Sequence, residues 1–339
     1  MFGVLVIHAS GAFEWKLLES QNWTSQEGLA ALLSQLARFC VPMFMILSGY
    51  GLGFSEHRRK LGAFGLGELK TFWSRRASRV LVPYLTWSIL SLFLMNRLWT
   101  DAGGVAWGDI AKSLLMGTAD YHLYFIAFLL QAYVLWPLLR KLSWWGVFGL
   151  LLLQVVFASP THVFWSSRPS IPGWLIVHWA GYFAFGAKLA QKPAPTHPRP
   201  ALALMVFGAL GMMVIGDYYW WSQRLPDPGW FNHFCRYAVI GFSLSAVWFW
   251  RASDHLVAQL VESKKLGSGL ARLSAVTFTV YFIHPWILRW LEASVLGQWY
   301  LAQVFALMIS SFGAALCLDR WLVGQWAHWP RLMLGLGPR

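Results

Sequence analysis

Two histidines interrupt long apolar runs of this 339-residue chain and are the first candidates for chemistry. His8 lies in MFGVLVIHAS, and His284 lies in SAVTFTVYFIHPWIL, directly before Pro285. A neutral imidazole can take a proton from a hydroxyl group near neutral pH, and a polar ring inside a membrane segment is costly enough to indicate function. The alternative is structural. A neighbouring helix can satisfy either ring, and Pro285 is expected to bend or end its helix and so expose the polar groups beside it.

Three arginines form a second candidate site. Arg75, Arg76 and Arg79 stand in FWSRRASRVLVPYL, where the spacing i, i+1 and i+4 lets them share one side of a helix. Guanidinium groups form paired hydrogen bonds with phosphates, so this side suits a phosphorylated ligand. Basic residues between two membrane spans also mark the cytoplasmic side during insertion, and this second interpretation explains the same residues.

Arg38 and Ser48 are further candidates in and near the second apolar run. Arg38 stands at the start of that run, where its charge can pair with an acid such as Glu14 or bind a substrate. Ser48 and Gly49 belong to the stretch LSGYG. Small residues in such a stretch more often allow close helix packing than substrate contact.

The elements that must position these residues are membrane-spanning helices. Hydrophobic residues make up 57% of the chain, charged residues only 12%, and the mean hydropathy is +0.49, which excludes an ordinary soluble domain. A helix needs roughly 20 mainly apolar residues to cross the hydrocarbon. The sequence predicts an all-α polytopic transmembrane bundle of about ten spans, forming a single domain over residues 1–339. The spans are centred near Val6, Met45, Ile89, Leu129, Leu152, Tyr182, Ala209, Phe242, Phe282 and Met308.

Basic residues divide unequally between the predicted loops. With the amino terminus inside, most of the 27 Lys and Arg residues fall after the even-numbered spans and in the carboxyl-terminal tail, which the positive-inside rule assigns to the cytoplasm. The net charge of +13 then follows from topology, and no nucleic-acid partner is needed. The three cysteines are scattered without CxxC spacing or a nearby histidine, so we expect neither disulfides nor a metal site.

The first apolar run is shorter than the others. Only about a dozen residues precede Glu14 and Lys16, which at ~1.5 Å each cover little more than half of a ~30 Å core. Either the helix enters the bilayer part way, or residues before Met1 are missing. We expect the second, a truncated first span.

Several stretches together resemble the acyltransferase-three family of membrane O-acyltransferases. They are FCVPMFMILSGYGLGF from Phe39, FWSRRASRVLVPYL from Phe72 and SAVTFTVYFIHPW from Ser274, while YHLYFIAFLLQAYVLWPLL from Tyr121 resembles the fourth span of that family. Each motif is loose, but together they occur in the correct order and cover most of the chain. Members of the family are bacterial membrane proteins that acylate surface sugars, so the resemblance implies a multi-pass protein of the bacterial cytoplasmic membrane.

The resemblance also implies catalytic residues. The first-span signature of the family is an Arg, ten intervening residues and a His, and His8 matches that His as the catalytic base. The Arg would fall before Met1. His122, which follows Asp120, matches a histidine before the aromatic run of the fourth span and becomes a candidate acceptor contact. His284 and Arg38 are candidates for catalysis or acceptor contact as well.

The basic motif completes the implied mechanism. Arg75, Arg76 and Arg79 match residues thought to receive acyl-coenzyme A from the cytoplasm. The implied reaction moves an acetyl or similar short acyl group from this co-substrate, without a metal, to a hydroxyl of a cell-surface or lipid-linked saccharide. The alternative is a glycan transporter, flippase or exporter of the same architecture. Transporters usually carry paired charges or broken helices at mid-depth, whereas ionisable groups here gather near span ends.

Overall fold

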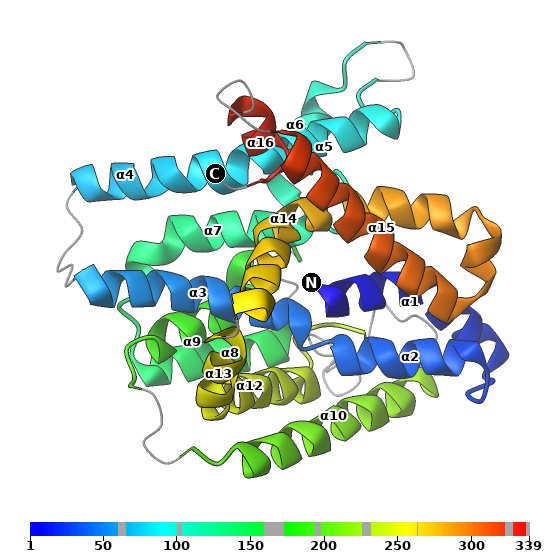
Figure 1. The fold of residues 1–339 in the computed structure, drawn as a ribbon, viewed down its shortest axis with the longest axis horizontal. Helices are drawn as coiled ribbons and strands as arrows, with labels where there is room; N and C mark the ends of the chain where they lie inside the picture. The colour runs from blue at the N-terminus through cyan, green and yellow to red at the C-terminus, as the bar shows by residue number, and fades with distance from the viewer. Residues whose placement is uncertain are drawn as a thin grey trace.

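The chain is helical in the computed structural model, which describes residues 1–59, 66–99, 104–158, 173–193, 198–225, 232–262, 264–322 and 328–336. Within these ranges there is no strand, only an isolated bridge between Trp99 and Val105. The longer helices lie side by side as a bundle (Figure 1). They are α1 (Phe2–Ser20), α2 (Gln26–Ala37), α3 (Cys40–Arg59), α4 (Leu66–Arg76), α5 (Val82–Leu94), α6 (Trp107–Met116), α7 (Tyr124–Leu139), α8 (Trp144–Ala158), α9 (Ala180–Leu189), α10 (Pro200–Ser222), α12 (Tyr237–Ala252), α13 (Asp254–Glu262), α14 (Lys264–Glu292), α15 (Tyr300–Trp321) and α16 (His328–Met333).

The prediction of an all-α, multi-pass membrane bundle is confirmed. Every predicted span centre falls inside a helix. Within the described ranges, five helical segments are long and apolar enough to cross a membrane, and shorter apolar helices accompany them. The five are Gln26–His57, Gly67–Leu94, Pro200–Ser222, Leu266–Glu292 and Tyr300–Trp321, and the shorter ones are Tyr124–Leu139 and Trp144–Val156.

Glycines let α3 and α9 approach closely. A Cβ added at Gly49 would lie 2.0 Å from the carbonyl oxygen of Phe183, and one added at Gly186 would lie 1.9 Å from that of Ile46. The two backbones therefore touch, as small residues permit in membrane helices. The packing interpretation of the LSGYG stretch agrees with this contact, which fixes one wall of the site described below.

Gly117 ends α6 and directs the chain into the turn before α7. Its φ of 73° lies in the left-handed region, which favours glycine, and a Cβ would approach the Cα of Tyr124 to 2.6 Å. The chain then passes through residues 118–123 into α7. This turn carries Asp120, Tyr121 and His122, so the glycine positions a segment in which Asp120 and His122 are buried and Tyr121 is exposed.

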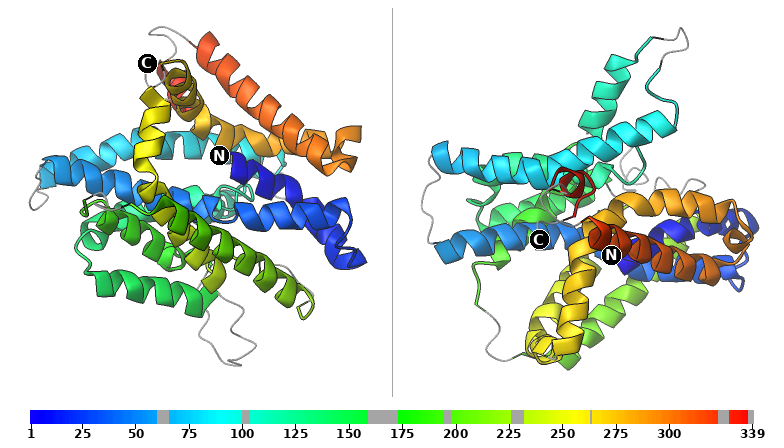
Figure 2. Two further views of the ribbon diagram at one scale, coloured as in Figure 1. Left: turned by 60° about the horizontal axis from the view of Figure 1, so that its bottom comes forward. Right: turned by 45° about the horizontal axis from the view of Figure 1, so that its top comes forward.

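Pro285 lies within α14 and does not end it. The helix continues to Glu292 and bends along its length (Figure 2). A proline inside a helix removes one backbone hydrogen bond, which accounts for a bend. The expected exposure of the neighbouring polar groups is wrong for His284, because this residue is fully buried.

The helix α1 runs past the charged residues that end its apolar run. Glu14 is 6% exposed and lies inside the bundle, while Lys16 is exposed. The Glu14 carboxylate accepts a hydrogen bond of 2.9 Å from the Asn232 side chain and lies 3.8 Å from the Arg38 guanidinium. These partners compensate the buried charge, so the helix extends through it to Ser20.

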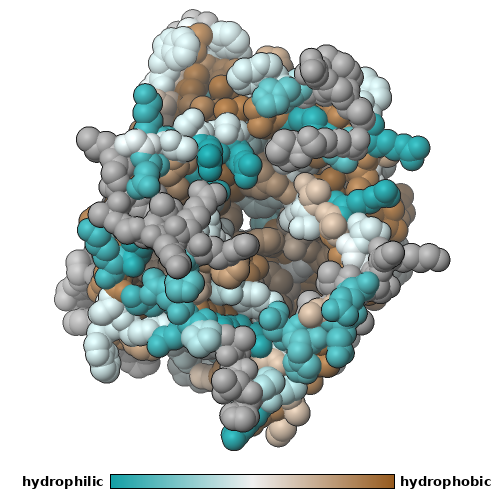
Figure 3. Space-filling view, turned by 60° about the vertical axis from the view of Figure 1, so that its left-hand side comes forward, coloured by the Kyte–Doolittle hydropathy of each residue, from teal (hydrophilic) through white to brown (hydrophobic). Residues whose placement is uncertain are grey.

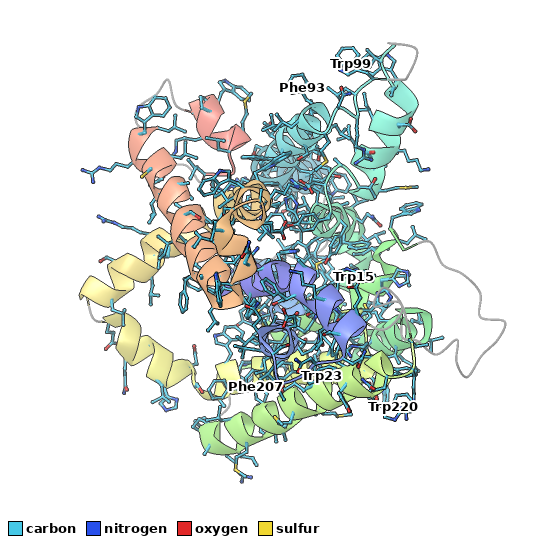
Figure 4. All side chains as sticks on the ribbon, turned by 90° about the vertical axis from the view of Figure 1, so that its right-hand side faces the viewer. Trp15, Trp23, Phe93, Trp99, Phe207 and Trp220 are labelled. Carbon is cyan, nitrogen blue, oxygen red and sulfur yellow. The ribbon has the colours of Figure 1, made fainter. Side chains whose placement is uncertain are left out.

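Aromatic rings gather in two regions of one side of the bundle. Trp15, Trp23 and Trp220 lie in one region of the face seen in Figure 4, and Phe93 and Trp99 lie in another. Four of these rings are about half exposed, and Trp23 packs against tyrosines of α10. Amphipathic and apolar rings at such positions are typical of the membrane interface.

Candidate active site

Three histidines from three separate segments meet inside the bundle. His8 comes from α1, His122 from the turn before α7, and His284 from α14. The ring centroids of His8 and His284 lie 5.0 Å apart, and those of His122 and His284 lie 5.4 Å apart. We call these three residues the histidine cluster. The sequence named each of them singly, and the structure brings them together.

His284 is held in one tautomer. Its Nδ1 lies 3.1 Å from the carbonyl oxygen of Val280, and a carbonyl can only accept, so Nδ1 carries the proton. Nε2 then presents a lone pair, and it has no hydrogen-bond partner within the described part of the chain. His8 is only partly buried, whereas His122 and His284 are enclosed. His8 is therefore the member of the cluster that a substrate can reach most easily.

The turn that carries His122 is tied to α14. Arg289 donates two hydrogen bonds to the Asp120 carboxylate, at 2.6 and 3.1 Å, and the hydroxyl of Tyr281 donates to the carbonyl of His122. Asp120 also accepts the backbone N–H of Tyr121 at 2.8 Å. The nearest oxygen of Asp120 is 3.9 Å from Nδ1 of His122. The expected Asp120–His122 pair is thus a loose contact, and Arg289 is the main partner of this carboxylate.

These contacts determine the protonation states of the Asp120 carboxyl group and the His122 imidazole. Burial raises the pKa of Asp120, but the neighbouring His122 and Arg289 outweigh it and lower that pKa to about 2. Burial lowers the pKa of His122 below its ordinary value, although Asp120 acts in the opposite direction. Near neutral pH the carboxylate is therefore charged and the imidazole is neutral.

Arg38 pairs with Glu14, which is the first of the two roles that the sequence suggested for it. Its guanidinium lies 3.8 Å from Glu14, donates to the carbonyl of Asn232 at 3.1 Å and covers the ring of Phe234 at 4.9 Å. Its Nε atom is buried and has no hydrogen-bond partner among the described residues. Arg38 also acts electrostatically on His8, so its charge is close to the histidine cluster.

A buried polar network extends from this pair and was missed from the sequence. Gln35 donates to Asn232 at 3.1 Å and accepts from Arg236 at 2.6 Å, and Arg236 donates to Asp217 at 2.8 Å. Arg236 is fully buried and Asp217 nearly so. The signal was present in the sequence, because Asp217 and Arg236 are isolated charges at the ends of apolar runs. Their pairing depends on the packing of α2, α10 and α12.

Ser48 makes a local hydrogen bond and lines an apolar cavity. Its hydroxyl donates to the carbonyl of Phe44 at 2.7 Å, one turn earlier in α3. The cavity has a volume of about 480 Å³. Its wall also contains Tyr281, which touches His122 and His284. Ser48 is therefore separated from the histidine cluster by an apolar space rather than being part of it.

The three predicted arginines line one cavity of about 640 Å³. Arg75 and Arg76 lie at the end of α4, and Arg79 lies in the π-helical turn Ala77–Leu81 that joins α4 to α5. The Arg76 guanidinium is 5.4 Å from the rings of both Phe72 and Tyr133. We call this space the basic cavity. No ion pair is found for these arginines among the described residues.

Two acids, Glu56 and Glu68, also line the basic cavity. Glu56 forms an ion pair with Arg140, and neither acid forms an ion pair with Arg75, Arg76 or Arg79 among the described residues. Figure 3 shows a central hollow on the side of the molecule from which the ends of α3 and α4 project, with hydrophobic residues inside it and hydrophilic residues further out on the same face. Guanidinium groups that lack an acidic partner and face a cavity are typical of an anion site.

The same two helices border the basic cavity and the apolar cavity. Leu52 of α3 and Trp136 of α7 line the basic cavity, whereas Ser48 and Leu129 of the same helices line the apolar one. Ser48 and Leu52 are one helical turn apart on α3. Leu129 and Trp136 are two turns apart on α7. The Arg76 ring partner Tyr133 lies between them on α7. The cavities thus follow one another along α3 and α7 toward the histidine cluster.

No group of His, Cys, Asp or Glu side chains within the described ranges is arranged to hold a metal ion.

The comparison with protein families agrees with the sequence motifs of the four stretches named above. The family model for an acyltransferase domain, Acyl_transf_3, matches residues 1–320. No curated protein and no solved structure matches the chain. A match over nearly the whole sequence shows that the chain belongs to the acyltransferase-3 family.

Proposed function

We propose that this membrane acyltransferase moves an acetyl or similar short acyl group from acyl-coenzyme A to a hydroxyl of a cell-surface or lipid-linked saccharide. The observation that carries the proposal is the line of two cavities along α3 and α7, with Arg75, Arg76 and Arg79 at one end and His8 beyond the other. In this proposal the protein lies in the bacterial cytoplasmic membrane and its arginine end faces the cytoplasm.

The basic cavity supports binding of the donor. The phosphates of coenzyme A need charge-assisted hydrogen bonds, which Arg75 and Arg79 can donate without first breaking an ion pair seen in the described ranges. The Arg76 guanidinium sits against Phe72 and Tyr133 at the inner part of this space. The apolar cavity continues toward Tyr281 and offers room for the thioester end of the donor.

His8 is the proposed base. Its neutral imidazole takes the proton of the acceptor hydroxyl as the oxygen attacks the thioester carbonyl. The new C–O bond forms, the C–S bond breaks, and the proton passes from His8 to the departing thiolate. The products are the ester and the free thiol of coenzyme A. His284, held by Val280, packs against His8 and limits the orientations of its ring.

The decisive experiment measures thiol release from acetyl-coenzyme A by the purified protein in detergent or nanodiscs. Release that depends on an added saccharide, with acetyl ester formed in equal amount, supports the proposal. Saccharide movement across proteoliposomes without loss of thioester would contradict it and favour the transporter.

A further inference from the structure

Tyr121 is an exposed aromatic residue that touches the proposed base. Its side chain is 46% exposed, although Asp120 and His122 on either side are buried. Its ring centroid lies 5.0 Å from that of His8. An open aromatic face therefore adjoins the partly exposed imidazole. Sugar rings present apolar C–H faces, and such faces stack on tyrosine and tryptophan rings.

Arg289 supplies free hydrogen-bond donors at the same place. An arginine has five N–H donors, and Arg289 gives one from each terminal nitrogen to Asp120. The other N–H groups have no hydrogen bond to any described residue, and the side chain is 33% exposed. The guanidinium lies 4.5 Å from the ring of Trp286 and 5.6 Å from that of Tyr121. Hydroxyl oxygens are suitable acceptors for these donors.

The charges around Tyr121 disfavour an anion. The positive charge of Arg289 is balanced by the carboxylate of Asp120, and Glu292 lies one turn further along α14. The charge of Arg38 is balanced by Glu14. Asp120 and Glu292 are matched by Arg289 and by Arg97, whose guanidinium donates to the carbonyl of Thr118 at 3.1 Å. No unpaired cation is therefore left among the described residues here to hold a carboxylate, and a carboxylated sugar would lose the hydration of its charge without gaining an ion pair.

We propose that Tyr121 and Arg289 form the acceptor subsite and that it takes a neutral pyranose. The sugar ring stacks on Tyr121, Arg289 donates to its hydroxyl groups, and one hydroxyl reaches His8. This inference rests on the proposed function and names the part of the acceptor that the site recognises. It also distinguishes Tyr121 from exposed tyrosines that only anchor the protein in the interface, such as Tyr219, whose ring contacts Trp23.

The test measures binding rather than turnover. The His8→Ala protein in nanodiscs is titrated with methyl glucoside and with methyl glucuronide, and binding is followed by saturation-transfer NMR. The glucoside should bind at least about tenfold more tightly than the glucuronide. Replacing Tyr121 by Ala should weaken glucoside binding about tenfold, in line with ~1.4 kcal/mol for loss of one stacked ring. Replacing Tyr121 by Phe should preserve binding, since Phe keeps the ring.

Tyr219→Ala is the matched control, because Tyr219 is 49% exposed and lies outside this cluster. Unchanged binding in Tyr121→Ala, equal loss in the control, preference for the glucuronide, or no binding of either glycoside would each overturn the subsite. Failure of the proposed function looks different. A protein that binds the glucoside through Tyr121 but never releases thiol from acetyl-coenzyme A keeps the subsite and loses the acyltransferase mechanism.

Discussion

The imidazole rings of His8 and His284 lie 5.0 Å apart, centroid to centroid, although the residues belong to the first and the penultimate long helices. His284 is fixed by the Val280 carbonyl and buried, while His8 is partly open. The pair therefore combines a rigid inner ring with an accessible outer one. A base that must receive a hydroxyl proton needs this kind of support, because its lone pair has to stay aimed at the substrate.

Replacing Arg76 and Arg79 together by Gln should weaken binding of acyl-coenzyme A about a hundredfold. Each charge-assisted hydrogen bond is worth about 1.5–3 kcal/mol, and both residues line the basic cavity. The dissociation constant is measured by isothermal titration calorimetry in nanodiscs. The affinity of the wild-type protein should also fall with added salt more steeply than that of the variant.

Arg272→Gln is the control for this pair. Arg272 is exposed on α14 and belongs to a predicted cytoplasmic segment, but it does not line the basic cavity. Donor affinity should be unchanged in this variant. If the Arg76 and Arg79 variant binds as tightly as the control, these arginines serve membrane topology alone.

Gly49→Ala should destabilise the bundle by about 1–3 kcal/mol, the usual cost of overpacking. The added methyl group would lie 2.0 Å from the Phe183 carbonyl oxygen and force α3 away from α9. Gly51→Ala is the matched control on the same helix, since nothing lies within 4 Å of its Cβ position. Thermal unfolding in detergent compares the two. Equal midpoints would show that α3 and α9 are not in the close contact described.

Arg289→Ala should cost about 3 kcal/mol of stability because it leaves the Asp120 carboxylate buried without its main partner. This is the lower end of the range for a buried pair, since Arg289 is one-third exposed. Adding Asp120→Asn should restore part of the loss by removing the uncompensated charge. Urea unfolding of the two variants provides the comparison. A double variant less stable than the single one would contradict this account of the pair.

The Asp120 carboxylate should also make the stability of the folded protein depend on pH. The folded-state pKa of Asp120 is lowered from 3.8 to about 2, so its stabilising contribution is complete above the unfolded value and is lost as the pH falls through the folded one. The stability difference between wild type and Asp120→Asn should be constant from about pH 5 to pH 8 and shrink below about pH 4. A difference that changes steadily near neutral pH would point to another titrating group.

Hydrophobicity was enough to predict the helices but not their arrangement. Apolar runs located a helix at every predicted centre, because a membrane span must satisfy its own backbone and therefore has to be helical. The helix α2 was missed, since it has only 12 residues and its apolar run LAALL stands between Gln and Glu at its start and Ser and Gln near its end. Pro285 was correctly expected to disturb α14, yet the sequence could not show that neighbouring helices bury His284 beside it.

The candidate site was predicted in parts. His8, His122, His284 and the three arginines could be named because polar residues are rare in apolar runs. Their grouping could not, because it depends on contacts between α1, α7 and α14 that are distant in sequence. Arg289 was missed for the same reason. Its role as partner of Asp120 follows only from the approach of α14 to the turn before α7.

The central claim is that His8 is the base that activates the acceptor hydroxyl. The most direct measurement compares acetyl transfer from acetyl-coenzyme A to a saccharide acceptor by wild type, His8→Ala and His255→Ala, with donor affinity and thermal stability measured on the same preparations. His255 is an exposed histidine outside the cluster. Transfer should fall by about 10²- to 10⁴-fold in His8→Ala, the usual contribution of a general base, while donor binding and folding stay intact. Full transfer by a folded His8→Ala protein would contradict the account.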